Sequence, residues 1–271
     1  MCTLILLYKM LEDYPVILAE NRDAPINSVE MPPHIANKDP AIYCAKDKKS
    51  GGIWFGLNEY GVAVGLTNLY SNTGETKPKG SIGRLCLEAL KQPASEEISG
   101  YLQETFDPLK YRKANILAAD ENSAILTMCD KNIEVIQLSP GIHVLTNYNL
   151  KHQPERSEDK DTFVDSVHRR DRATKLLKGY GIKEKKDIND VITVLQRVLS
   201  DHENAGNVVS VGDYFKICCH GDLERYNWQT KSSSIMAVSK DGIENSMYLY
   251  SPGNPCRVPY ADYSAILREA A

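Results

Sequence analysis

The sequence lacks any long apolar run. No stretch approaches the ~20 consecutive apolar residues that a helix needs to cross a bilayer, so we expect no membrane span. The apolar stretch after Met1 has no basic leader before it and no small-residue cleavage site after it, which argues against a secretory signal. These absences favour a cytoplasmic protein.

An excess of positive charge is also missing. The 32 Lys and Arg residues are outnumbered by 36 Asp and Glu residues, which gives a formal net charge of -4. Proteins that bind nucleic acids depend largely on clustered Lys and Arg, so no nucleic-acid partner is expected. The apolar content of 42% and the charged content of 25% are those of a folded globular protein.

Cysteine pairs spaced for a zinc knuckle or a disulfide framework are absent. The seven cysteines are odd in number and none forms a Cys-x-x-Cys pair, so most are expected to be buried thiols in a reducing compartment. Cys218, Cys219 and His220 combine soft ligands, and a metal or haem site is the alternative there to buried thiols. Since no second pair follows and the other histidines considered show no ligand spacing (His34, His143, His152 and His202), we expect no metal and no cofactor.

The sequence does contain an ordered succession of strand-like and helix-like segments. Strands are predicted over Cys2–Tyr8, Pro15–Ala19, Ile53–Leu57, Val62–Thr67, Asn115–Ala119, Ala124–Cys129, Ile133–Leu138, Ile142–Thr146, Ser232–Val238 and Ser246–Tyr250. Helices are predicted over Ile82–Leu90, Ile98–Phe106, about Ser166–Lys178 and Asp187–Ser200. This order predicts an α+β protein with two packed antiparallel sheets covered outside by helices. No repeat or linker interrupts it, so we expect a single domain over residues 1–271.

Residues 149–162 stand apart because they are polar and show no periodicity. They are predicted to be unstructured. A mobile loop and a lid over a site are equally consistent with this composition.

Cys2 is singled out by its position. If Met1 is removed, Cys2 becomes the first residue, and its thiol and free α-amino group share one carbon framework. An α-amino group has an ordinary pKa of roughly 7.7–8.0, so much of it can act as a base near neutrality. The nucleophile then carries its own general base, although a cysteine at this position is also a plain way to begin a core strand.

Asparagine follows three of the predicted apolar strands. Asn21, Asn68 and Asn147 stand where side chains can emerge into a cleft, and Asn amides can donate to an oxyanion or orient an amine. Asn after a strand is also an ordinary turn residue, so each position taken alone has both interpretations.

Taken together, these segments resemble the N-terminal-nucleophile (Ntn) hydrolase superfamily. The match is to the NRDE family of transport-and-Golgi-organisation-like proteins, carried by Met1–Leu4, Glu20–Asp23, Gly51–Gly61, Leu66–Asn68, Pro140–Asn147 and Thr230–Ser234. A more distant resemblance is to choloylglycine hydrolases and penicillin V acylases. The resemblance implies a four-layer αββα sandwich and cleavage of a C–N bond through a thioester on Cys2.

The resemblance also implies roles for individual residues. Asp23 would orient the amino group of Cys2, while Asn68 and Asn147 would hold the amine and polarise the carbonyl. Arg169 or Arg172 matches a helical arginine of those enzymes, with a solvated helix face as the alternative. Arg22 and Asn21, with Arg172, are the candidates for binding substrate.

The chain departs from both patterns at two positions. Ala24 replaces the last residue of the Asn-Arg-Asp-Glu motif, and Glu20 stands where the bile-salt enzymes have arginine. The role of Arg22 is therefore open: it could hold Asp23, bind substrate or pair with Glu20.

The sequence as a whole supports a hydrolase of linear amides that acts on a small acyl-amide or peptide-like substrate. The alternative is a non-catalytic carrier of lipid, acyl-CoA or haem on the same scaffold. The sequence also leaves open whether the protein forms a homo-oligomer.

Overall fold

A computed structural model describes residues 2–69, 80–148, 157–203, 216–221 and 227–269, with only the backbone of residues 157–162. The helices are α1 (Ile82–Ala89), α2 (Ser95–Thr105), α3 (Ser157–Gly179) and α4 (Ile188–Leu199). The strands are β1 (Thr3–Tyr8), β2 (Val16–Pro25), β3 (Glu30–Lys38), β4 (Ala41–Asp47), β5 (Phe55–Asn58), β6 (Ala63–Asn68), β7 (Ala114–Ala119), β8 (Ala124–Cys129), β9 (Ile133–Gln137), β10 (Gly141–Leu145), β11 (Trp228–Val238), β12 (Met247–Ser251) and β13 (Ala261–Asp262). None of the described helices is long and apolar enough to cross a membrane.

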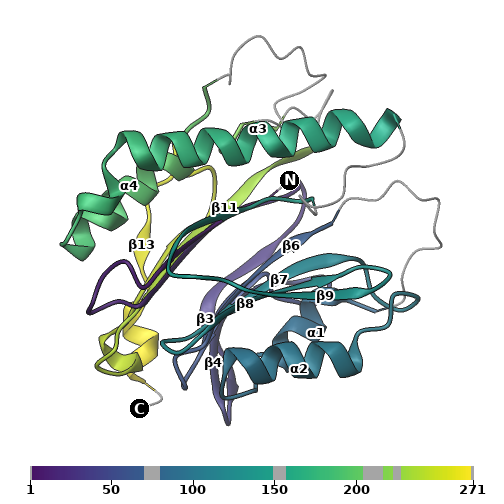
Figure 1. Cartoon of the computed structure of the whole chain (residues 1–271), viewed down its shortest axis with the longest axis horizontal. Helices are drawn as coiled ribbons and strands as arrows, with labels where there is room; N and C mark the ends of the chain where they lie inside the picture. The colour runs from purple at the N-terminus through teal and green to yellow at the C-terminus, as the bar shows by residue number, and fades with distance from the viewer. Residues whose placement is uncertain (1, 70–79, 149–156, 204–215, 222–226, 270–271) are drawn as a thin grey trace.

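The strands form two antiparallel sheets. The first has the order β10-β1-β2-β11-β12-β13, and the second runs in sequence order from β3 to β9. Helices α3 and α4 cover the outer face of the first sheet, and α1 and α2 cover the outer face of the second (Figure 1). This is the predicted αββα sandwich.

Alternation of side chains along β1 and β2 explains why both faces of the first sheet are buried. Leu4, Leu6 and Leu18 point inward to the core between the sheets. Ile5 and Ile17 point outward and pack against the apolar faces of α3 and α4. The N-terminal strand therefore lies at the centre of the molecule, with a different environment on each face.

Several predicted boundaries differ from the structure. Residues 157–162 were predicted to be unstructured but begin helix α3, and residues 149–156 lie outside the described part. Asn21–Asp23 were placed after a strand but lie inside β2, whose pairing with β11 continues to Pro25. Strands β3 and β4 were not predicted individually.

Candidate active site

Cys2 directly precedes β1, between β10 and β2 in the first sheet. It is buried, with 5% of its surface exposed, and by strand alternation its side chain shares the inward face with Leu4. The thiol therefore lies at the end of a central strand, between the two sheets.

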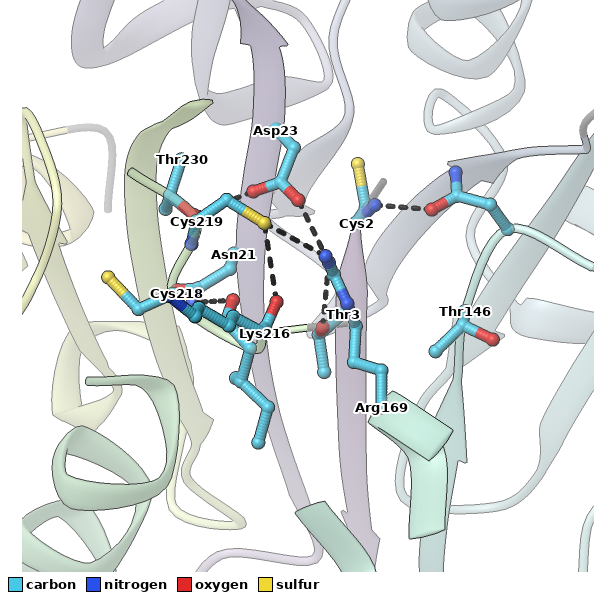
Figure 2. A network of polar contacts seen from close by, with 12 residues as sticks. Cys2, Thr3, Asn21, Asp23, Thr146, Arg169, Lys216, Cys218, Cys219 and Thr230 are labelled. Atoms are coloured by element: carbon cyan, nitrogen blue, oxygen red, sulfur yellow. Dashed lines mark hydrogen bonds and ion pairs between the residues drawn. The ribbon is translucent and has the colours of Figure 1, made fainter. Parts of the chain in front are cut away.

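The backbone nitrogen of Cys2 donates a hydrogen bond to Oδ1 of Asn147 (Figure 2). Nδ2 of Asn147 in turn donates to the backbone carbonyl of Asn68 at 2.8 Å. Asn147 is buried, whereas Asn68 is exposed and contributes its main chain to this contact. Of the two predicted asparagines, Asn147 thus contacts Cys2 directly, whereas the backbone carbonyl of Asn68 contacts Asn147.

Two buried side chains of the second sheet hold the residue before Asn147 in place. The hydroxyl of Thr67 donates to the carbonyl of Thr146 at 2.8 Å, and Nδ2 of Asn115 donates to the same carbonyl at 3.2 Å. Thr67 and Asn115 are directly paired across β6 and β7. These bonds fix the end of β10 against the second sheet, and therefore fix Asn147 beside Cys2.

Asp23 and Arg169 form a buried ion pair on the outer face of the first sheet. Nη1 of Arg169 lies 2.8 Å from Oδ2 of Asp23, and both side chains are at most 1% exposed. The hydroxyl of Thr230 donates to Oδ1 of Asp23 at 2.7 Å. Arg169 also contacts Oγ1 of Thr3 at 3.4 Å and Sγ of Cys219 at 2.9 Å (Figure 2). Helix α3, β1, β2 and β11 thus meet at the Asp23–Arg169 ion pair.

The charge of Asp23 follows from these contacts. Burial alone would raise the pKa of its carboxyl group. The positive charges beside it, including Arg169, and the hydrogen bonds from Arg169 and Thr230 more than offset burial, so the pKa of Asp23 is below its ordinary value. Asp23 is an ionised carboxylate held in one orientation.

Glu20 is a second buried carboxyl group, on the inward face that also carries Cys2. It is 1% exposed, and its carboxyl group lies beside the Cys2 thiol and the backbone of Leu66. Burial raises its pKa well above the ordinary value, with a further contribution from Asp23. Burial, and then the proximity of Glu20, raise the pKa of the Cys2 thiol to about 12.

The side chains predicted to bind substrate form hydrogen bonds and ion pairs with other parts of the protein. Nδ2 of Asn21 donates to two backbone carbonyls, at 2.8 Å to Leu199 and 2.9 Å to Ile217. This side chain joins the end of α4 to the segment before β11. Its position supports a structural role.

Arg22 forms a bridge between the sheets. Its guanidinium pairs with Glu30 of β3 and, at 3.0 Å, with Asp47 of β4, and it lies 4.2 Å from the ring centre of Trp54. The sequence left three roles open for Arg22, one of which was an ion pair with Glu20. Among the described residues, its carboxylate partners are instead Glu30 and Asp47, both in the second sheet.

Arg172 lies farther along α3 at the rim. It forms a two-pronged ion pair with Asp201, at 2.7 and 3.1 Å, and contacts Glu203 at 3.0 Å. Of the two arginines proposed from the sequence, Arg169 is the one that contacts Asp23.

Sequence reasoning did not assign Glu20, Thr230 or Cys219 to the site. A polar residue inside the apolar run of β2 was the available signal for Glu20. Thr230 lies in a motif that carries the family resemblance, but its contact with Asp23 depends on the pairing of β11 with β2. Cys219 reaches Arg169 from a segment without regular structure, and its position could not be derived from spacing.

The fold is similar to those of solved hydrolases. A variant of conjugated bile acid hydrolase from Clostridium perfringens has a TM-score of 0.58 and 14% identity, covering 97% of this chain and 93% of that chain. The Caenorhabditis elegans ortholog of N-acylethanolamine-hydrolyzing acid amidase has a TM-score of 0.53 and 14% identity, covering 90% and 98%. Penicillin V acylase from Agrobacterium tumefaciens has a TM-score of 0.54 and 12% identity, covering 98% and 88%. At these identities the likeness shows the fold, that of the Ntn hydrolases.

None of the curated proteins matches the chain in sequence. The family model described as Transport and Golgi organisation 2 matches residues 1–248. This match confirms the resemblance carried by the sequence motifs, and the chain belongs to the Transport and Golgi organisation 2 family.

Proposed function

We propose that the chain is an Ntn cysteine hydrolase that cleaves the C–N bond of a small acyl amide through a thioester on Cys2. The observation that carries the proposal is the hydrogen bond from the nitrogen of Cys2 to Oδ1 of Asn147. If Met1 is removed, that nitrogen becomes the α-amino group, and Asn147 orients it beside the thiol of the same residue.

The proposed reaction begins with the thiol of Cys2 as the nucleophile. Its proton passes to the α-amino group as Sγ bonds to the carbonyl carbon of the substrate, and the carbonyl π electrons move to oxygen. When the C–N bond breaks, the ammonium returns the proton to the leaving amine and the acyl group remains as a thioester. Water then hydrolyses the thioester, with the same amine as base.

Asn147 is also the candidate donor for the developing oxyanion. An amide nitrogen carries two N–H groups, and one of them is used by the carbonyl of Asn68. The second is available in this proposal for a substrate oxygen, which would gain stabilisation mainly in the transition state.

The charges around Cys2 suit transfer of a proton within one residue. The ionised carboxylate of Asp23 favours an ammonium group at Cys2. The ion pair of Asp23 with Arg169 keeps the site from carrying a net negative charge. A raised pKa at Glu20 favours the neutral carboxylic acid beside the thiol. Because burial raises the pKa of the Cys2 thiol to about 12, the thiol in this proposal is uncharged at rest and is deprotonated only during attack.

The names of the structural neighbours support a small acyl substrate. They are a bile acid hydrolase, an acid amidase and a penicillin V acylase. Because the guanidinium of Arg22 is paired with Glu30 and Asp47, other residues would recognise the acyl group of the substrate in this proposal.

A carrier on the same scaffold is the second candidate function. The observation that favours it is the burial of Cys2, since a thiol that is 5% exposed with a pKa near 12 is a poor free thiolate. A carrier would bind an acyl compound or haem without forming a thioester.

The deciding experiment compares the parent with Cys2→Ala. Each is treated with methionine aminopeptidase and incubated with fluorogenic acyl amides of increasing chain length. Because alanine also permits removal of Met1, the variant differs only by the thiol. We expect turnover and a thioester mass on Cys2 in the trimmed parent, and loss of both by at least about 10³-fold in Cys2→Ala.

Cys129→Ala is the matched control, because Cys129 is a buried thiol on the outer side of the second sheet. It should retain turnover. Equal activity in Cys2→Ala, or activity that does not depend on removal of Met1, would contradict the hydrolase. Binding of an acyl compound by a fully trimmed parent without turnover or thioester would favour the carrier.

A further inference from the structure

Four side chains with nitrogen or sulfur ligand atoms, from three segments of the chain, meet beside Cys219. His202 follows helix α4, Cys218 and His220 precede β11, and Cys256 lies in the turn after β12. Nitrogen atoms of the two histidines and Sγ of Cys256 all lie within 4.8 Å of one another. Sγ of Cys218 is 3.6 Å from Sγ of Cys256.

Neighbouring side chains in the segment around Cys219 contact different parts of the protein. Cys218 and Cys219 point in opposite directions (Figure 2), with Cys219 directed to Arg169. Cys218 and His220 both contact Cys256, as side chains two residues apart can do in an extended segment. This alternation separates the four side chains from the candidate active site.

His202 is arranged as a ligand by its backbone contact. Its Nδ1 lies 3.1 Å from the carbonyl oxygen of Ser200, which accepts hydrogen bonds only. Nδ1 therefore carries the proton, and Nε2 keeps its lone pair. Metal-binding histidines are commonly held in this way, with the second ring nitrogen donating to a backbone carbonyl.

His220 stacks on His202, with ring centres 5.2 Å apart, and its Nε2 is 3.0 Å from Sγ of Cys256. Nη2 of Arg257 lies 3.3 Å from Nδ1 of His220. A metal at Nε2 requires the ring proton to move to Nδ1, so Arg257 must turn away. Arg257 is exposed and has room to do so.

We propose that His202, Cys218, His220 and Cys256 bind one Zn²⁺ ion. Zinc prefers this mixture of imidazole and thiolate ligands in a tetrahedron, where two thiolate sulfurs at ~2.3 Å from the metal lie about 3.8 Å apart. The observed sulfur separation of 3.6 Å is close to that value. As the ion binds, the two thiols release their protons to solvent, and the histidines bind through neutral nitrogens.

The site would join the end of α4, the Cys219 segment and the turn after β12. Asn254 already donates to the carbonyl of Cys219 at 2.7 Å, and the nitrogen of Cys218 donates to Asp201 at 2.8 Å. Zinc would add a cross-link at Cys218 and at His220, the residues on either side of Cys219. It would therefore fix the segment whose sulfur contacts Arg169.

The test uses the full chain, reduced and freed of metal. Zn²⁺ is titrated in competition with a chromophoric chelator, and Co²⁺ is used as a spectroscopic probe. We expect one equivalent of Zn²⁺, a thiolate-to-Co²⁺ charge-transfer band, and the strong visible bands of tetrahedral Co²⁺. Loss of one ligand in Cys256→Ser or His220→Gln should weaken binding at least about 100-fold.

Three variants serve as controls. His143→Gln removes a histidine outside the cluster, and Cys2→Ala removes the thiol that could chelate with a free α-amino group. Both should bind Zn²⁺ as the parent does. Arg257→Ala should bind more tightly, because it removes the cation beside His220.

The Co²⁺ spectrum of the parent is independent of how well the variants fold. A parent without a thiolate-to-Co²⁺ band would overturn the proposal. Loss of the metal in Cys2→Ala with retention in Cys256→Ser would also overturn it, and so would a Cys218–Cys256 disulfide in protein isolated anaerobically with reductant.

Discussion

Glu20 places a carboxyl group between two sheets, on the same face as the thiol that the proposed reaction uses. Its carboxyl group is buried, and its neighbours include the Cys2 thiol and the backbone of Leu66. Ionising such a group costs more than in water, which is why its pKa is raised. The nearby Arg22 lowers this pKa, but its guanidinium is already paired with Glu30 and Asp47.

Glu20→Gln should therefore remove the contribution of Glu20 to the pH dependence of stability. The folded-state pKa is raised, so the contribution of Glu20 to stability is complete below the unfolded pKa and is lost as pH rises toward the folded pKa. Above about pH 4.5 the parent should lose up to about 1.4 kcal/mol per pH unit relative to the variant, until Glu20 ionises in the folded state. Urea unfolding from pH 5 to 9 measures the difference.

The exposed Glu121→Gln is the control for this experiment, because it removes a carboxylate at the surface. Its stability should follow that of the parent at every pH. A second measurement is alkylation of the Cys2 thiol, which should become faster in Glu20→Gln at high pH because the neighbouring negative charge is gone. A constant stability difference between parent and Glu20→Gln over the whole range would show that Glu20 is ionised throughout.

At the scale of elements, the buried ion pair between Arg169 and Asp23 joins α3 to the first sheet. Arg169 is fully buried and its guanidinium spans from Asp23 of β2 to Thr3 of β1. Burying the two charges is costly, so the pair contributes little net stability. Removing one partner, however, leaves the other charge uncompensated in the interior.

Arg169→Leu should therefore destabilise the protein by about 3–5 kcal/mol. Arg170→Leu, on the same helix, removes a partly exposed arginine paired with Asp171 and should cost less than about 1 kcal/mol. Chemical denaturation of both variants provides the comparison. Similar losses in the two would mean that α3 is held by its apolar contacts alone.

The periodicity of the sequence was sufficient to predict that the four described helices exist and to predict most of the interior strands, although not β4. Ile188–Leu199 shows a clear apolar face, and the strands of the second sheet from β5 to β9 are short apolar runs between turns. Strand β3 was missed because it is half-buried at a sheet edge, contains Pro32 and Pro33, and pairs irregularly with β4. The start of α3 was missed because its first residues are polar.

The candidate site was predictable only where a residue belonged to a motif that carries the family resemblance. Cys2, Asn147, Asp23 and Arg169 were named from the sequence, and the structure brings them together. The partners of Arg22 were not foreseen because Glu30 and Asp47 belong to the other sheet. Contacts between sheets depend on packing, which no local pattern in the sequence encodes.

At the scale of the whole molecule, the two sheets share one core. Leu4, Leu18 and Met236 of the first sheet pack in the same cluster as Phe55 and Leu117 of the second. Ion pairs of Arg22 with β3 and β4 join the sheets again near the site. We therefore propose that residues 1–271 form a single domain that unfolds in one cooperative transition.

Gly65 of β6 packs directly against Leu4 of β1, across the space between the two sheets. A Cβ atom at this position of β6 would lie 2.5 Å from Cδ1 of Leu4, so alanine would push β1 away from the second sheet. Gly65→Ala should cost about 1–3 kcal/mol by overpacking and should lower turnover, because Leu4 is two residues from Cys2.

Gly100→Ala is the matched control in α2, with no atom near the added methyl group, and should stabilise by roughly 0.5–1 kcal/mol. Thermal unfolding followed by far-UV and near-UV circular dichroism measures both. Two separate transitions in the parent, or a Gly65→Ala protein as stable and active as Gly100→Ala, would mean that the sheets do not depend on each other.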